Sequence, residues 1–276
     1  MKRVLVLLAL AGVTALPGIA AATAAEAPVQ PLPPPPPPRP SALVVAVSLG
    51  NPALQAGVLK GREVVMARGF EIHLARVLAK RLGIPVARLV DVRPPQRLLT
   101  AQAPPWHIAI AGIEPPRGSG PVDLSAPYLT TDLAVVLRRG LARPRRLSDL
   151  RTAVLCVARG DGALTAVERA VRPARAPLVA SGRERLLQLV RTGACDAAVV
   201  PAYEAGRFIA GQRGLLGPVA GRIAHGKGLV VAVARSSGIP VAEVNRRLGR
   251  LWADGTLGRL ARTWLGLDPA RLRRLG

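Results

Sequence analysis

GFEIHLARVLAKRLG, at residues 69–83, is the stretch of sequence that decides the fold. Its apolar residues recur at helical spacing and form one stripe: Ile72, Ala75, Val77, Leu78 and Leu82. Gly83 follows the last of them, and glycine readily adopts the left-handed conformation that ends many helices. The stretch therefore predicts an amphipathic helix with one face against a core.

Apolar strands are expected on both sides of this helix. Residues 43–47 form a mostly β-branched run before it, and residues 87–92 and 107–113 form two more after it, separated by a short helix at 96–103. Strands that alternate with helices favour parallel pairing through right-handed crossovers. The first half of the chain therefore predicts an α/β lobe.

The same alternation recurs in the second half. The expected strands are 131–138, 151–158, 177–180, 196–200 and 228–234, and the expected helices are 164–170, 183–192 and two within 240–266. We expect an α/β fold of two lobes, each a mainly parallel sheet flanked by helices, joined by two hinge strands. The expected limits are 43–134 for lobe 1, 135–228 for lobe 2, and 229–276 for the return to lobe 1 with the C-terminal helices.

Segments in this order resemble the family 3 extracellular solute-binding proteins, the type II periplasmic binding fold of polar amino-acid ABC transporters. GFEIHLARVLAKRLG is similar to the Gly-Phe-Asp-x-Asp-Leu-Ala helix of that family. The other matching segments are HIAIAGIEPPR, VDLSAPY, LSDLRTAVLCVARGDG, CDAAVVPAYEA and VNRRLGRLWADGTLGRLARTWLG. The resemblance implies a monomer that closes two lobes over a small ligand for an ABC permease, without a cofactor.

The resemblance also implies a ligand-binding residue in the loop EPPRGSG. In the family an arginine there binds the ligand carboxylate, and Arg117 is the matching residue; its planar fork suits a carboxylate. Glu114 stands near the place where the family has a threonine. The alternative is that Arg117 is an ordinary solvated arginine.

Other family positions have changed. The glycine-serine-threonine loop of lobe 2 reads Gly160-Asp161-Gly162, where Asp161 repels a carboxylate and could instead cap the next helix. The acid that binds an amino group is replaced by Pro201, although Tyr203 and Glu204 follow it.

The loop after the first strand lacks the family's stacking aromatic and offers Ser48 and Asn51. The sequence therefore lacks several of the contacts by which the family binds an α-amino acid. The ligand-binding candidates are Ser48, Asn51, Glu114, Arg117, Gly160, Asp161, Gly162 and Tyr203, for a small polar or anionic ligand.

The N-terminus has the features of a secretory signal peptide. Lys2 and Arg3 precede the apolar run 4–13, and Ala22-Thr23-Ala24 has the small-x-small pattern of a cleavage site. The run is too short to span a membrane. We expect a signal peptide at 1–25, a proline-rich linker at 26–42 and a soluble periplasmic protein.

The chain is strongly basic, with 39 Lys and Arg against 16 Asp and Glu and a formal charge of +23. Nucleic-acid binding is disfavoured, because the arginines are dispersed and only three Trp, two Tyr and two Phe are available for stacking on bases. An anionic ligand or an acidic periplasmic partner protein fits such a charge better.

Cys156 and Cys195 form a possible disulfide, since exported proteins mature in an oxidising compartment. Cys156 is expected within a strand and Cys195 before one, so an offset could keep them apart as two buried thiols. The spacing leaves both alternatives open.

Neither a metal site nor an enzyme is expected. His73 and His107 stand where the family has aspartates, but no third ligand is suitably spaced. The sequence lacks a Gly-x-Ser-x-Gly elbow, a phosphate loop and a paired acid. The alternatives to transport are a periplasmic accessory protein, such as a partner of quinoprotein methanol dehydrogenases, and an enzyme that uses Glu114 or Asp161.

Overall fold

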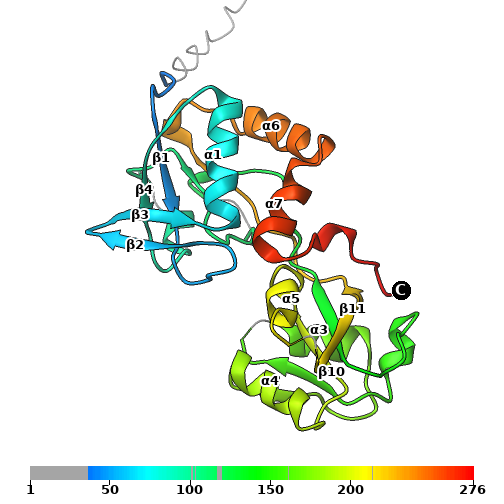
Figure 1. Ribbon diagram of the computed structural model, residues 1–276. Helices are drawn as coiled ribbons and strands as arrows, with labels where there is room; N and C mark the ends of the chain where they lie inside the picture. The colour runs from blue at the N-terminus through cyan, green and yellow to red at the C-terminus, as the bar shows by residue number, and fades with distance from the viewer. Residues whose placement is uncertain (1–36, 101, 103, 117–119, 161, 213) are drawn as a thin grey trace, which may run out of the picture. The chain divides into compact units, whose positions relative to one another are not determined.

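The computed structural model describes residues 37–276 except 101, 103, 117–119, 161 and 213. The expected signal peptide and most of the expected linker lie outside these residues. No helix in the described part of the chain is long and apolar enough to cross a membrane. The described strands form two sheets, each with its own helices, which are the two lobes seen in Figure 1.

The first sheet has seven strands in the order β2-β3-β4-β1-β5-β12-β6. The central strands β4, β1 and β5 are parallel, whereas the strands on both sides of them pair antiparallel. Their bounds are β1 Leu43–Val47, β2 Ala56–Lys60, β3 Glu63–Arg68, β4 Val86–Asp91, β5 Ile108–Ala109, β6 Val122–Leu124 and β12 Ala232–Ala234.

The second sheet has five strands in the order β11-β7-β10-β8-β9. Strands β10, β8 and β9 are parallel, and β7 and β11 are antiparallel to their neighbours. Their bounds are β7 Leu133–Arg138, β8 Leu155–Ala158, β9 Leu178–Ala180, β10 Ala197–Pro201 and β11 Leu216–Ile223. The chain enters this sheet at β7 and leaves it after β11, and these are the two crossings that the sequence predicts; a third follows α7.

Helices flank both sheets, and Figure 1 shows α1, α6 and α7 in one lobe and α3, α4 and α5 in the other. The α-helices are α1 Phe70–Leu82, α2 Arg97–Thr100, α3 Ala163–Ala170, α4 Arg183–Arg191, α5 Ala202–Ile209, α6 Val241–Ala253 and α7 Thr256–Leu265. Three 3-10 turns lie at Leu147–Leu150, Arg235–Ser237 and Pro269–Arg271. This mixed α/β architecture confirms the predicted fold class, with parallel strands at the centre of each sheet and antiparallel strands beside them.

Helix α1 forms where the apolar stripe predicts it. Phe70, Ile72 and Leu78 are fully buried, and α1 packs against α6 and α7. Gly83 ends the helix in the left-handed conformation, with φ 72°, and its N–H bonds the last turn. The other end of α1 is tied to the loop after β1, because Glu71 N donates to Leu54 O at 3.0 Å.

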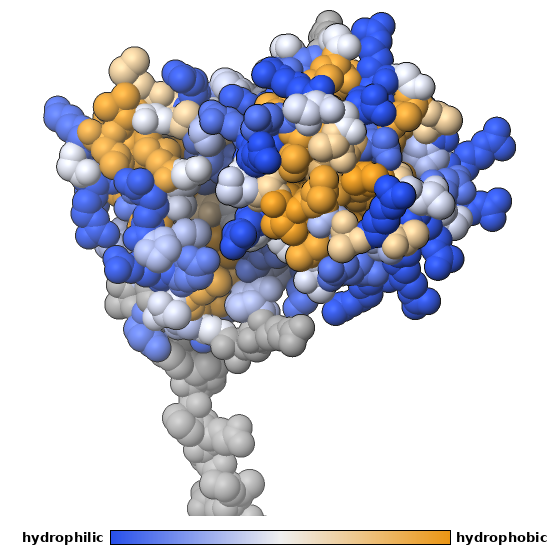
Figure 2. Space-filling view, turned by 90° about the horizontal axis from the view of Figure 1, so that it is seen from below, coloured by the Kyte–Doolittle hydropathy of each residue, from blue (hydrophilic) through white to orange (hydrophobic). Residues whose placement is uncertain are grey.

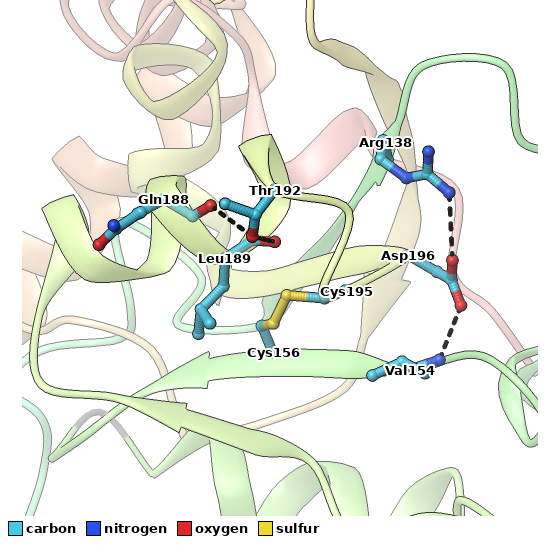
Figure 3. Close-up of a disulfide and its surroundings, with 8 residues drawn as sticks. All are labelled: Arg138, Val154, Cys156, Gln188, Leu189, Thr192, Cys195 and Asp196. Atoms are coloured by element: carbon cyan, nitrogen blue, oxygen red, sulfur yellow. Dashed lines mark hydrogen bonds and ion pairs between the residues drawn. A yellow bond between two sulfur atoms is a disulfide. The ribbon is translucent and has the colours of Figure 1, made fainter.

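Cys156 and Cys195 are joined by a disulfide inside the second lobe (Figure 3). Both residues are fully buried, and their Cα atoms are 6.0 Å apart. Cys156 lies in β8 and Cys195 just before β10, so the bridge crosses between two parallel neighbours. Beside it, Asp196 accepts from Val154 N at 2.9 Å and lies 3.5 Å from the guanidinium of Arg138.

The last residues of the chain return to the second lobe after α7 (Figure 1). Leu275 N donates to Arg222 O at 2.9 Å, and Arg222 N donates to Arg273 O at 2.8 Å, so this segment pairs with the edge of β11. The Leu275 side chain is 2% exposed and belongs to the core of this lobe. A side chain on Gly221 would overlap Leu275, so the glycine permits the close approach.

Leu275→Ala should lower the free energy of unfolding by about 2 kcal/mol, because it removes buried methyl groups and leaves a cavity. Urea unfolding followed by circular dichroism measures the change. Arg274→Ala alters the exposed neighbour and should change stability by less than about 0.5 kcal/mol. Equal effects of the two substitutions would contradict a core role for Leu275.

Candidate functional site

The candidate site lies at the carboxyl ends of the central strands of both sheets. In the first lobe these ends lead into the loops after β1 and β5, and in the second lobe into the loop after β8 and the start of α5. The ends of parallel strands leave backbone groups and loop side chains free to meet a ligand. Three pockets are lined by residues of these segments.

The three pockets share Tyr203, which stands at the start of α5. The β1 pocket has a volume of about 220 Å³, the β5 pocket, at the loop after β5, about 320 Å³, and the hinge pocket about 380 Å³. The β1 pocket is lined by Ser48, Gly50, Asn51, Leu54, Gln55, Pro95, Ala111, Gly112, Tyr203 and Leu229. The β5 pocket is lined by Pro95, Gln96, Leu99, Gly112, Ile113, Glu114, Tyr203 and Leu229. The hinge pocket is lined by Glu114, Thr131, Leu133, Gly160, Gly162, Pro201, Tyr203 and His225.

Six of the eight predicted ligand-binding residues therefore line these pockets. Ser48 and Asn51 line the β1 pocket, Gly160 and Gly162 the hinge pocket, Glu114 two of the pockets, and Tyr203 all three. Arg117 and Asp161 lie outside the described residues. Ligand contact by any of the eight remains a prediction.

Tyr203 is positioned by α5, which packs closely on the end of α7. Gly206, one turn further along α5, faces Leu265 O, and a side chain there would collide with this carbonyl. Tyr203 and Glu204 follow a predicted strand, but no helix was expected at the position of α5. The missing side chain of Gly206 is therefore what allows the helix that carries Tyr203 to approach the first lobe.

Below the β1 pocket lies a fully buried carboxyl group, that of Glu71 in the first turn of α1. It accepts hydrogen bonds from Gly112 N at 3.0 Å, from the Tyr128 hydroxyl and from Gln55 Nε2. Burial raises the pKa of Glu71 to about 7, against the opposing effect of these three donors. Gln55 also accepts from Ser48 N at 2.9 Å, so this network holds the backbone of two pocket-lining segments.

Asn51 is engaged across the two lobes. Its Nδ2 donates to Glu204 Oε1 at 2.8 Å, and its Oδ1 accepts from Ala53 N at 3.0 Å. A second contact joins the same segments, because Arg207 donates to Pro52 O at 3.3 Å. In this structure the polar atoms of Asn51 thus connect the loop after β1 to α5.

The two segments that cross between the lobes, before β7 and after β11, are linked through the carboxylate of Asp132. Asp132 is mostly buried, forms an ion pair with Arg222 of β11, and accepts from His225 N at 2.9 Å. The imidazole of His225 lies against Gly162 at the start of α3: a Cβ placed there would be 3.0 Å from His225 Nε2. Asp132 thereby fixes the return segment that brings His225 to the hinge pocket.

The two histidines that occupy family aspartate positions have structural contacts. His107 Nδ1 accepts from Val44 N at 2.9 Å, and burial lowers the pKa of His107. The ring of His73 lies 4.4 Å from that of Trp264. In the described ranges no three His, Cys, Asp or Glu side chains are grouped so as to hold a metal ion.

Sequence reasoning missed Glu71, Thr131 and His225. Glu71 stands in the first turn of the predicted helix, and a carboxyl group between two apolar residues there was the available signal. His225 lies in a glycine-rich basic turn, AHGKG, that has no periodic pattern. Nothing in such a turn indicates which side chain points to a pocket.

Comparison with known families gives one match. The model described as bacterial extracellular solute-binding proteins, family 3, matches residues 58–267. A search of curated protein sequences gave no match.

Solved structures of similar fold cover most of the chain. Substrate-binding domain 2 of GlnP from Lactococcus lactis, in an open conformation, is 15% identical over 84% of this chain and 98% of that one, with a TM-score of 0.67. An ancestral cationic amino acid solute-binding protein is 20% identical over 82% and 96%, with a TM-score of 0.61. An ancestral cyclohexadienyl dehydratase is 23% identical over 82% and 93%, with a TM-score of 0.60. At these identities the likeness shows the fold alone.

Proposed function

Because the chain belongs to the bacterial extracellular solute-binding proteins of family 3, we propose that it binds a small polar ligand between its two lobes and delivers it to an ABC-type transporter. The proposed site of action is the periplasm, and the proposed role is binding rather than catalysis. Ligand binding would shift the population toward a closed form that the permease recognises.

One observation carries this proposal: residues from both lobes line the same pockets. Glu114 follows β5 of the first sheet, whereas Gly160 follows β8 and Pro201 ends β10 of the second, and all three line the hinge pocket. A molecule held there contacts both lobes at once. Its binding free energy therefore depends on the angle between them, as a binding protein requires.

Ligand-induced stabilisation tests the proposal. A true ligand at about 100 times its dissociation constant should add about 2.7 kcal/mol to the free energy of unfolding. Thermal unfolding in the presence of amino acids, amines, organic acids and sugars measures this gain. If no compound raises the unfolding temperature, the protein does not bind these classes of solute and the proposal is wrong for them.

A second candidate function is favoured by the contact between Asn51 and Glu204. This bond uses polar atoms at the edge of the β1 pocket to join the lobes, and Pro201 offers no charge to a ligand. Both features suit a periplasmic accessory protein that binds a partner, such as a quinoprotein dehydrogenase, instead of a solute. Co-purification of the tagged protein with a dehydrogenase and not with a permease would select this candidate.

A further inference from the structure

The described acidic side chains next to these pockets form hydrogen bonds or ion pairs, with one exception. Glu204 accepts from Asn51, and Asp132 forms an ion pair with Arg222. Among the residues that the structure describes, none forms a hydrogen bond or an ion pair with the side chain of Glu114, which is exposed. Glu114 is therefore the acid that is available to a ligand.

The carboxylate of Glu114 lies within the candidate ligand site between the lobes. Glu114 lines both the β5 pocket and the hinge pocket, together with Tyr203. A Cβ placed on Gly226, in the return segment between the lobes, would lie 3.4 Å from Glu114 Oε1. The carboxylate thus reaches the boundary between the lobes, where a ligand would be enclosed.

The charge of the pocket walls is negative at this point. Of the described residues that line the three pockets, Glu114 is the one Asp or Glu, and none is Lys or Arg. The chain as a whole is strongly basic, but at physiological salt charges more than about 8 Å away are largely screened. A contact at about 4 Å in a partly enclosed site is worth several times the same contact in water. Arg183 and Arg207 line a further pocket beside Gly50 and Asn51, together with Glu204, so the carboxylate of Glu114 favours a positively charged group at its own end of the site.

Part of the wall next to Glu114 is apolar. Leu99, Ile113 and Leu229 line the β5 pocket with it, and Ile113 and Leu229 are almost fully buried. Such a wall favours a hydrocarbon portion adjacent to the charged group. The carboxylate and this wall together describe a ligand with a cationic end and a short apolar chain.

We propose that Glu114 binds a positively charged nitrogen group of the ligand, so that the solute is a small organic amine or guanidine with a hydrocarbon portion. The inference rests on the proposed solute-binding function and narrows its ligand class. It differs from the expectation of an anionic ligand, and it assigns the nitrogen contact to the first lobe, since Pro201 in the second lobe cannot supply it.

Isothermal titration with agmatine, putrescine and lysine as cationic probes, and succinate and glutarate as anionic probes, tests the inference. At least one cationic probe should bind the wild-type protein, and Glu114→Gln should weaken its binding by at least about 10-fold, equivalent to about 1.4 kcal/mol. Glu168→Gln makes the same charge change at an exposed site on α3 that lines none of the three pockets. The Glu168→Gln variant should bind the same cationic probe with an affinity within about 2-fold of wild type.

The outcomes separate this inference from the function on which it rests. Undiminished amine binding by Glu114→Gln, or binding of dicarboxylates but not of amines, overturns the role of Glu114 and leaves solute binding intact. Failure of the wild-type protein to bind any of the five probes overturns the amine class; a response to other compounds in the thermal screen would then still support solute binding.

Discussion

Replacing Cys156 and Cys195 together by alanine should lower the free energy of unfolding by about 4 kcal/mol. The bridge closes a loop with a sequence separation of 39 residues, and a loop of this length restricts the unfolded chain by about that amount. Because the bridge links β8 to the start of β10, its loss acts on the second lobe. Denaturant unfolding of the oxidised protein and of the double variant measures the difference.

Reduction provides the matched control for this experiment. A thiol reductant should destabilise the wild-type protein by a similar amount and leave the alanine variant unchanged. A double variant within about 1 kcal/mol of wild type would show that the bridge constrains the unfolded chain far less than its length predicts.

The second large effect is a pH dependence that originates at Glu71. Its pKa rises from 4.5 to about 7 because the carboxyl group is fully buried. Between these two values the folded protein retains a proton that the unfolded chain has released, so stability falls as the pH rises. The interval corresponds to a loss on the order of 3 kcal/mol, complete above about pH 7.

Glu71→Gln isolates this contribution, because glutamine has a similar shape and does not titrate. The difference in unfolding free energy between variant and wild type should shift in favour of the variant by about 3 kcal/mol from about pH 4 to about pH 8. Glu168→Gln, on the surface of α3, should follow the wild-type profile. Parallel profiles for Glu71→Gln and wild type would show that the buried carboxyl group does not titrate in this range.

Much of the fold could be predicted because its decisive elements repeat their signal over many residues. Helix α1 has an apolar stripe and a terminal glycine, and two helices follow Pro240 as predicted, separated by Asp254 and Gly255. Short or irregular elements gave no such signal. The hairpin of β2 and β3 escaped prediction: Val58, Leu59 and Met66 are exposed there, so its apolar residues do not mark a buried face.

The candidate site could be predicted in part. Ser48, Gly160 and Tyr203 follow recognisable strands, so their place at the strand ends was foreseeable. The hydrogen-bond partners of the site residues could not be predicted, because hydrogen bonds between distant segments leave no local sequence pattern. The bond from Asn51 to Glu204 spans 153 positions of sequence.

Charge was the least informative property. The chain is strongly basic, yet the face in Figure 2 carries hydrophilic side chains in many separate places with apolar areas between them. Total charge sets the long-range potential of a protein, whereas a binding site depends on the few groups at contact distance. The anionic ligand expected from composition and the amine proposed from Glu114 differ for this reason.

The segment that pairs with β11 also covers part of an edge of the second sheet. Strand β11 is at one end of its sheet, and an uncovered edge strand is a template on which another chain can add. Arg273 and Leu275 occupy part of that edge with hydrogen bonds of the same chain. These bonds use backbone groups of Arg222 that an edge strand would otherwise offer to another chain, so they keep that part of the edge from intermolecular pairing.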